Sequence, residues 1–156
     1  MKITPKNYPE KFEVTSCTNW DRETGGNIIT SHGKLNFDTH KAFGGKSSGY
    51  CPDELFLVSI CGCFITTTVS FLSKFDDIKI EDFTVSAKLS LVFEPSGYKI
   101  SMIKMDAVIS IQNQDDKQTA MRILELGEQY CHLLHFIKQS TNLIVKKSVI
   151  CDPPKF

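Results

Sequence analysis

The sequence predicts an α+β fold in which an antiparallel sheet packs on one long, buried central helix. Three features favour this class: an uncharged stretch with helix-entry signals in Pro52–Phe75, alternation of apolar residues in Ile78–Phe93, and helical spacing of apolar residues in Thr119–Tyr130. The chain of 156 residues is long enough to bury one core. We therefore expect a single domain at residues 10–156, preceded by an N-terminal tail at residues 1–9.

Strand and turn signals precede the central stretch. Phe12, Val14 and Trp20 share one side of an alternating segment, and the dipeptide His32-Gly33 separates two short arms. We expect, in order, a strand at Glu10–Trp20, a turn at Asp21–Gly26, a hairpin of Asn27–Ser31 with Lys34–Asp38, and a flexible connection at Lys41–Gly49.

Pro52–Phe75 carries the signals of a buried helix. Pro52 suits the first helical position because its missing N–H is not needed there, and Asp53 and Glu54 complement the positive end of the helix dipole. No charged residue occurs from Leu55 to Leu72, so the helix, of roughly six turns, is apolar on nearly every side. Helices with such a surface are typically buried.

Two other interpretations of this stretch compete with a core helix. An uncharged run of 18 residues reaches the lower limit for a membrane span, but small and polar residues interrupt it, namely Ser59, Gly62, Thr66, Thr67, Thr68 and Ser70. Valine, isoleucine and threonine are also common in buried strands, but the length and the Pro-Asp-Glu start favour a helix. We expect the core helix of a soluble protein.

Beyond the central helix the pattern predicts two long strands, two helices and a last strand. The apolar face of the second strand changes parity near Met102-Ile103, which indicates a bulge. The expected segments are strands at Ile78–Phe93 and Tyr98–Ile111 joined by a turn at Glu94–Gly97, an exposed polar segment at Gln112–Asp116, helices at Thr119–Tyr130 and His132–Gln139, and a strand at Asn142–Ile150. The order is β-β-β-α-β-β-α-α-β.

A helix that is apolar all round needs more cover than one sheet face supplies. The chain has little else with which to cover it. We infer a homodimer in which two copies of Pro52–Phe75 lie against each other, each backed by its own sheet.

Composition and charge narrow the classes of function. Eighteen basic residues balance eighteen acidic ones, so there is no sign of a surface for nucleic acid. Met1–Phe12 lacks the apolar centre of a signal peptide, so we expect a cytoplasmic protein with no membrane association. Six cysteines are too sparse for a small secreted disulfide scaffold, so we expect reduced thiols, of which one or two are reactive.

Two cysteine motifs resemble those of the OsmC/Ohr superfamily. The stretch PDELFLVSICGC, residues 52–63, is similar to its central-helix motif, in which a P-E-E-L-L-type start leads to a reactive cysteine about eleven residues on. The stretch ELGEQYC, residues 125–131, is similar to its second motif, and SHGKL, residues 31–35, to its S-D-G-x-L hairpin. The resemblance extends over residues 10–150, and the two cysteine motifs together make it more specific than either alone.

The resemblance implies an intertwined homodimer of α+β subunits that reduces organic hydroperoxides, although other members of the superfamily have no settled activity. It implies Cys63 as the peroxidatic cysteine and Cys131 as the resolving one, with an external thiol or lipoyl-type reductant and neither cofactor nor metal. The chemistry needs a thiolate that attacks the peroxide to form a sulfenic acid, and a second cysteine that condenses with it. The alternative for both residues is an inert core thiol.

Cys61 competes with Cys63 for the peroxidatic role. On a helix the two side chains point about 200° apart, so only one can face a given site. The motif register selects Cys63. For the same geometric reason a Cys-x-Cys pair on a helix is a poor metal chelate.

A thiolate in an apolar helix needs a charged partner, because desolvation disfavours it. The resemblance assigns Arg22 and Asp53 to this role, although the spacing of Arg22 to the SHGKL stretch is shifted and Asp53 is one methylene shorter than the usual glutamate. Ten residues, about 15 Å of helical rise, separate Asp53 from Cys63, so Asp53 can reach only the cysteine of a partner chain. We predict an active site shared between subunits.

Several further residues carry weaker expectations. Phe43, Tyr50 and Phe64 are candidates for an apolar substrate pocket near Cys63, with ordinary packing as the alternative. We expect His132 and His135 on a helix surface or in the core.

Two other functions stay open. One is a non-enzymatic dimeric module of the same fold that binds an apolar small molecule in the groove between its subunits. The other is a metal-binding or redox-sensing protein that uses Cys51, Cys61, Cys131 and His135.

Overall fold

The structure, a computed structural model, describes residues 11–72, 74–75 and 78–151, and the tail expected at residues 1–9 lies outside them. The chain divides into two compact units, Met1–Pro52 and Asp53–Phe156, and each is described by itself. Across the described residues, strands and helices follow the predicted order β-β-β-α-β-β-α-α-β, with two short 3-10 helices added.

Three antiparallel strands form the sheet of the first unit, in the order β1-β2-β3. They are β1 (Cys17–Trp20), β2 (Gly25–Thr30) and β3 (Gly33–Asp38), and a 3-10 helix, η1, follows at Lys41–Phe43. The β2–β3 hairpin is confirmed, but the strand predicted to begin at Glu10 is wrong in its start, because residues 11–16 are not strand. The partner strand β2 ends only one residue beyond Ile29, which pairs with Cys17, so the ladder has little room to extend.

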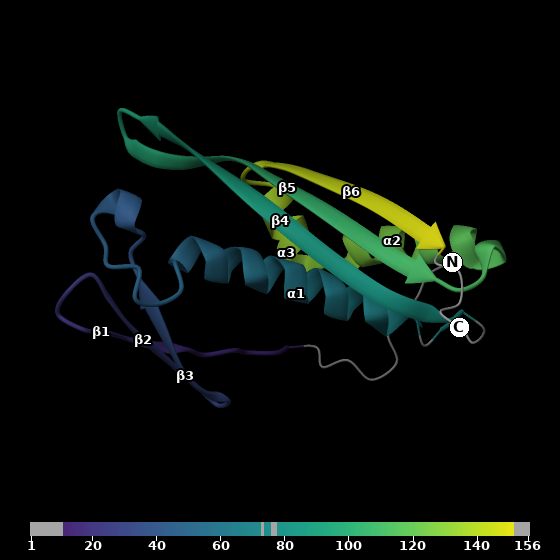
Figure 1. The fold of residues 1–156 in the computed structure, drawn as a ribbon, viewed down its shortest axis with the longest axis horizontal. Helices are drawn as coiled ribbons and strands as arrows, with labels where there is room; N and C mark the ends of the chain where they lie inside the picture. The colour runs from purple at the N-terminus through teal and green to yellow at the C-terminus, as the bar shows by residue number, and fades with distance from the viewer. Residues whose placement is uncertain (1–10, 73, 76–77, 152–156) are drawn as a thin grey trace. The chain divides into compact units, whose positions relative to one another are not determined.

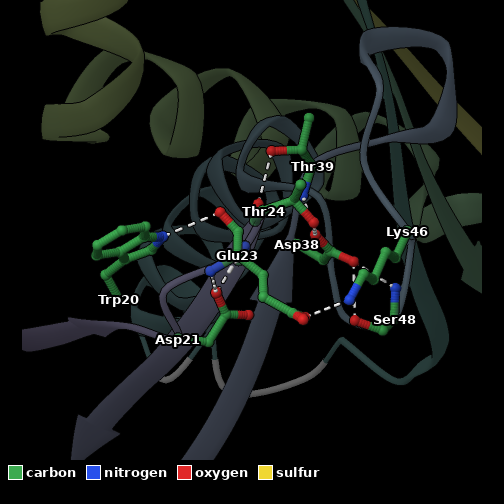
Figure 2. A network of polar contacts seen from close by, with 9 residues as sticks. Trp20, Asp21, Glu23, Thr24, Asp38, Thr39, Lys46 and Ser48 are labelled. Carbon is green, nitrogen blue, oxygen red and sulfur yellow. Dashed lines mark hydrogen bonds and ion pairs between the residues drawn. The ribbon is translucent and has the colours of Figure 1, made fainter.

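A polar network ties the segment after β3 to the sheet of the first unit (Figure 2). The buried Asp38 carboxylate accepts hydrogen bonds from the N–H and the hydroxyl of Ser48, both at 2.8 Å. It also accepts from Thr24 Oγ1 and from the Thr39 N–H, both at 2.7 Å. These donors, the Ser48 N–H first, hold the pKa of Asp38 well below its usual range. The connection expected to be flexible is therefore fastened by hydrogen bonds.

Helix α1 (Pro52–Leu72) begins at the predicted proline and is continuous. Its predicted end at Phe75 is wrong: the N–H groups of Lys74 and Phe75 bond to carbonyls three residues back, which makes a tighter turn. Among the described residues, α1 is long and apolar enough to cross a bilayer, a property that core helices of soluble proteins share.

Only one side of α1 is buried within the second unit. The buried residues Ile60, Phe64, Thr68 and Phe71 recur every three or four positions and form one stripe. On another side, Val58 is 67% exposed. Within the second unit, the prediction of a helix buried on every side is therefore not confirmed, because the sheet and the later helices of this unit cover one side of α1 only.

The sheet of the second unit contains β4 (Ile80–Glu94), β5 (Gly97–Ile111) and β6 (Asn142–Cys151), in that order. β4 and β5 form an antiparallel hairpin, and the predicted bulge is confirmed, because the pairing skips Ser101. β6 runs parallel to β5, so the prediction of a wholly antiparallel sheet is wrong. The two helices between them carry the chain back across the sheet, and β6 therefore starts at the same end as β5.

Helices α2 (Lys117–Tyr130) and α3 (His132–Lys138) follow a second 3-10 helix, η2 (Gln114–Asp116). With α1 they lie on one face of the β4-β5-β6 sheet (Figure 1). Alternate residues of β5 are buried beneath the helices, while Lys104 and Asp106 on the opposite face are exposed. The core contains, among others, Ile60, Phe64, Ile103, Met105, Ala107, Ala120, Leu124, Cys131 and Leu134.

Helices α1 and α2 approach each other closely at Gly127. A Cβ atom added to this glycine would lie 2.0 Å from Thr68 Oγ1 and 2.9 Å from Thr68 Cβ. Only glycine therefore permits the helices to come this close. Cys131 follows one helical turn later, so this crossing sets how near the end of α2 lies to α1.

Candidate active site

Cys131 occupies the joint between α2 and α3. It ends one helix and starts the next, with extended backbone angles of φ −71° and ψ 110°. Its N–H bonds to the Gly127 carbonyl and its carbonyl accepts the His135 N–H, both at 2.9 Å. The break in the helix is thus held by hydrogen bonds on both sides, and it fixes where the Cys131 side chain lies.

The structure brings Cys63 of α1 and Cys131 together. Their Sγ atoms are 3.4 Å apart, with the Cys131 thiol donating to the Cys63 sulfur. Both are free cysteines, and Cys131 is buried whereas Cys63 is partly exposed. The pair therefore combines a sulfur that solvent can reach with a sheltered one in contact with it.

Burial raises the pKa of the Cys131 thiol to about 11, and its hydrogen bond to Cys63 acts in the same direction. The N–H groups of Leu134 and Leu133 favour the thiolate but do not overcome burial. Near neutral pH, Cys131 is therefore a protonated thiol that must lose its proton before it can act as a nucleophile.

His132 joins the cysteine pair, a position that the sequence did not predict. It is the first residue of α3 and is exposed, as expected of a helix-surface residue, but its Nδ1 and Nε2 atoms lie 3.7 Å and 3.8 Å from Cys63 Sγ. The one signal in the sequence that could have identified His132 is its position directly after a candidate resolving cysteine. That signal is weak, because only the fold shows that the joint faces Cys63.

Cys61 faces different surroundings from Cys63. It lines an apolar groove of about 510 Å³ between α1 and β4, together with Glu54, Leu57, Val58, Gly62, Ile65, Val85 and Ala87. Burial raises the pKa of the Cys61 thiol. The side chains of Cys61 and Cys63 thus face two different surroundings, because residues two positions apart on a helix point in nearly opposite directions.

Arg22 stands in the turn between β1 and β2. Its φ of 71° is left-handed, a conformation that costs a non-glycine residue about 1–2 kcal/mol. The turn is braced by Asp21, whose carboxylate accepts from the Glu23 N–H at 2.7 Å, and by Trp20 Nε1, which donates to the Glu23 carbonyl at 3.0 Å (Figure 2). Arg22 belongs to the first unit, so its relation to Cys63 stays a prediction.

Asp53 lies in the first turn of α1 and is partly buried. Because α1 is continuous, about 15 Å of helical rise separates Asp53 from Cys63 in the same chain. The Asp53 carboxylate can therefore reach Cys63 only if that cysteine belongs to another chain, and this contact stays a prediction.

The three pocket candidates belong to two different units. Phe43 and Tyr50 belong to the first unit and are 49% and 55% exposed. Phe64 is fully buried, and its ring packs edge-on against Phe83 with centroids 6.0 Å apart. The structure gives Phe64 a place in the core rather than on an open pocket.

Metal ligation finds no support in the described residues. Within residues 11–72, 74–75 and 78–151, no three or more His, Cys, Asp or Glu side chains are grouped so that they could hold a metal ion. Cys61, Cys131 and His135, three of the residues considered for a metal, form no such group within the second unit, whereas Cys51 belongs to the first unit.

Solved structures with this fold match nearly the whole chain. An organic hydroperoxide resistance protein OsmC from Legionella pneumophila is 20% identical, with a TM-score of 0.70, and the match covers 88% of this chain and 98% of that protein. An organic hydroperoxide resistance protein from Elizabethkingia anophelis is 18% identical, with a TM-score of 0.72 and coverage of 92% and 100%. An OsmC-like protein of unknown function from Vibrio cholerae is 14% identical, with a TM-score of 0.71 and coverage of 88% and 99%. At these identities the likeness shows the fold.

Comparison of the amino-acid sequence shows the family as well as the fold. No curated protein matches the chain in sequence. The profile of the family described as OsmC-like protein matches residues 44–146, about two thirds of the chain, and both Cys63 and Cys131 lie within the match. The chain therefore belongs to the OsmC-like protein family.

Proposed function

We propose that this OsmC-like protein is a thiol-dependent peroxidase that reduces organic hydroperoxides. The observation that carries the proposal is the 3.4 Å contact between the sulfur atoms of Cys63 and Cys131. Cys63, which is partly exposed, attacks the peroxide and becomes a sulfenic acid. Cys131, held in contact with it, condenses to a disulfide that an external thiol or lipoyl-type reductant then opens.

Family membership supports this choice of chemistry. Two solved structures with the same fold carry the name organic hydroperoxide resistance protein, whereas another is of unknown function. The reaction uses sulfur alone, so we propose no cofactor. A cytoplasmic location fits the proposal, because reducing surroundings keep such cysteines reduced between turnovers.

A homodimer is part of the proposal. Exposed apolar side chains support it: Val58 and Val69 on α1 are 67% and 45% exposed. In the first unit Trp20 is 71% exposed. Surfaces of this kind are typical of protein interfaces. Paired α1 helices would also let Asp53 of one subunit approach Cys63 of the other, and Arg22 would complete the site by stabilising the thiolate.

Light scattering on the purified protein tests the homodimer. We expect the mass of two chains at micromolar concentration. A monomer at that concentration would contradict both the paired α1 helices and the shared site.

The peroxidase activity is tested by mapping disulfides after a stoichiometric dose of cumene hydroperoxide. We expect rapid formation of a Cys63–Cys131 bond in the reduced protein, detected by peptide mass spectrometry. The matched control is Cys61→Ser, which removes the neighbouring thiol of the same helix and should leave this bond unaffected. Cysteines that stay reduced, or a disulfide that uses Cys61 instead, would contradict the proposal.

The groove beside Cys61 favours a second candidate function. Apart from Glu54, its lining is apolar or small, and its volume of about 510 Å³ is in the range of small-molecule sites. A protein that binds an apolar ligand there without chemistry would leave all thiols reduced in the peroxide experiment. The same experiment therefore separates the two candidates.

A further inference from the structure

The ring of His132 lies against the sulfur that the proposed reaction uses. Both of its nitrogen atoms are within 3.8 Å of Cys63 Sγ, so in either tautomer one ring nitrogen is available to that sulfur. The ring reaches this position because His132 directly follows Cys131 at the joint of α2 and α3. A fold that brings Cys131 to Cys63 therefore brings His132 with it.

Other titratable groups of α2, α3 and β6 have partners of their own. His135, one turn further along α3, interacts through Nε2 with the Gln139 side chain at 3.1 Å. Lys138 pairs with Glu128 of α2 at 2.7 Å, and Lys147 of β6 pairs with the same carboxylate. In the described part of the chain, the titratable groups that contact Cys63 Sγ are His132 and Cys131.

We propose that His132 holds Cys63 as a thiolate and carries protons in both steps of the reaction. The inference rests on the proposed function for its second part, while the first part concerns only the ionisation of Cys63. A cationic imidazole at this distance stabilises a thiolate directly, which is the task that the family resemblance implies for Arg22.

The first step uses the imidazolium as an acid. The Cys63 thiolate attacks the terminal oxygen of the hydroperoxide, a sulfur–oxygen bond forms, and the oxygen–oxygen bond breaks. The departing alkoxide takes the proton of His132 and leaves as an alcohol. Cys63 is then a sulfenic acid, and His132 is neutral.

The second step uses the neutral imidazole as a base. It takes the proton of the buried Cys131 thiol, which ionises poorly without help. The Cys131 thiolate attacks the Cys63 sulfur, a disulfide forms, and the sulfur–oxygen bond breaks. The departing hydroxide takes this proton back from His132 and leaves as water. Overall, two thiols are oxidised to a disulfide and the hydroperoxide is reduced to alcohol and water.

The test measures Cys63 alkylation and peroxide oxidation separately. Iodoacetamide labelling of Cys63 is followed by peptide mass spectrometry over a range of pH, in a Cys131→Ser background that isolates this sulfur. We expect His132→Gln to lower the labelling rate at pH 7 roughly ten- to a hundredfold and to move the pH of half-maximal rate upward by about one unit or more.

Three variants serve as controls. His135→Gln removes a histidine of the same short helix that interacts with Gln139, and it should leave the labelling profile unchanged. His132→Lys retains a cation that does not release its proton at neutral pH, so labelling should recover while disulfide formation after peroxide stays slow. Arg22→Gln reports the contribution of the other candidate cation.

The outcomes separate this inference from the proposed function. An unchanged profile in His132→Gln, above all with a shifted one in Arg22→Gln, would overturn the inference and leave the peroxidase intact. A shifted profile in a protein that never reacts with peroxide would retain the thiolate partner and reject the peroxidase. If His132→Gln forms the disulfide as fast as the wild type at pH 7, the proton-carrying role is rejected.

Discussion

Replacing Cys63 by serine is expected to abolish the reduction of cumene hydroperoxide. With a dithiol as reductant, peroxide consumption should fall at least about a thousandfold, because a serine hydroxyl is far less nucleophilic than a thiolate. The loss should appear in single turnover as well as in steady state, and no disulfide should form at Cys131. A coupled assay of peroxide consumption, combined with thiol counting, measures both.

Cys131→Ser is the matched contrast, because it removes the other sulfur of the same contact. In the absence of added reductant, this variant should still consume one equivalent of peroxide and retain a sulfenic acid on Cys63 that dimedone traps. Cys63→Ser should trap none. If Cys63→Ser protein consumed peroxide at the wild-type rate, another cysteine would be the nucleophile and the proposed mechanism would fail.

Replacing Gly127 by alanine is expected to destabilise the protein by about 1–3 kcal/mol, despite the better helix propensity of alanine. The new Cβ would lie 2.0 Å from Thr68 Oγ1 and 2.9 Å from Thr68 Cβ, so rotation of the threonine cannot relieve the second contact and the helices must move apart. Because Cys131 follows on the same helix, we also expect slower formation of the Cys63–Cys131 disulfide. Urea unfolding and timed disulfide mapping measure the two effects.

A double-mutant cycle tests whether contact with Thr68 causes this loss of stability. Thr68→Ala removes Oγ1, which otherwise donates to the Phe64 carbonyl at 2.8 Å, and it has its own cost. Gly127→Ala should then cost less in the Thr68→Ala background than in the wild type, with a coupling of roughly 0.5–3 kcal/mol. Strictly additive effects would show that the two helices are not in the close contact seen here.

Most of the fold was predictable because local signals and burial agree. Pro52, Asp53 and Glu54 start the central helix where the sequence places it, and the parity change on β5 corresponds to the observed bulge. The direction of β6 was not predictable from alternation, because a strand has the same pattern whether it runs parallel or antiparallel to its neighbour. Similarly, alternation in residues 11–16 predicted a strand that lacks a partner long enough to pair with it.

The candidate site was likewise predictable only in part from the sequence. Cys63 and Cys131 were identified from motifs, but nothing in their spacing of 68 residues states a distance. That distance depends on Gly127, which lets α1 and α2 approach, and on the break at Cys131. His132 was missed because its contact with Cys63 depends on this geometry alone.

By itself, the amino-acid sequence determined which segments become helices and strands and which two cysteines are candidates for the chemistry. The helices and strands follow from neighbouring residues, through backbone preferences and the spacing of apolar side chains, whereas the two cysteines were identified by the resemblance of their motifs to the OsmC/Ohr superfamily. Tertiary structure alone decided that the two sulfurs touch, that His132 accompanies them and that β6 runs parallel to β5. Contacts between residues distant in the chain come from the close packing of whole elements, which local sequence patterns do not specify.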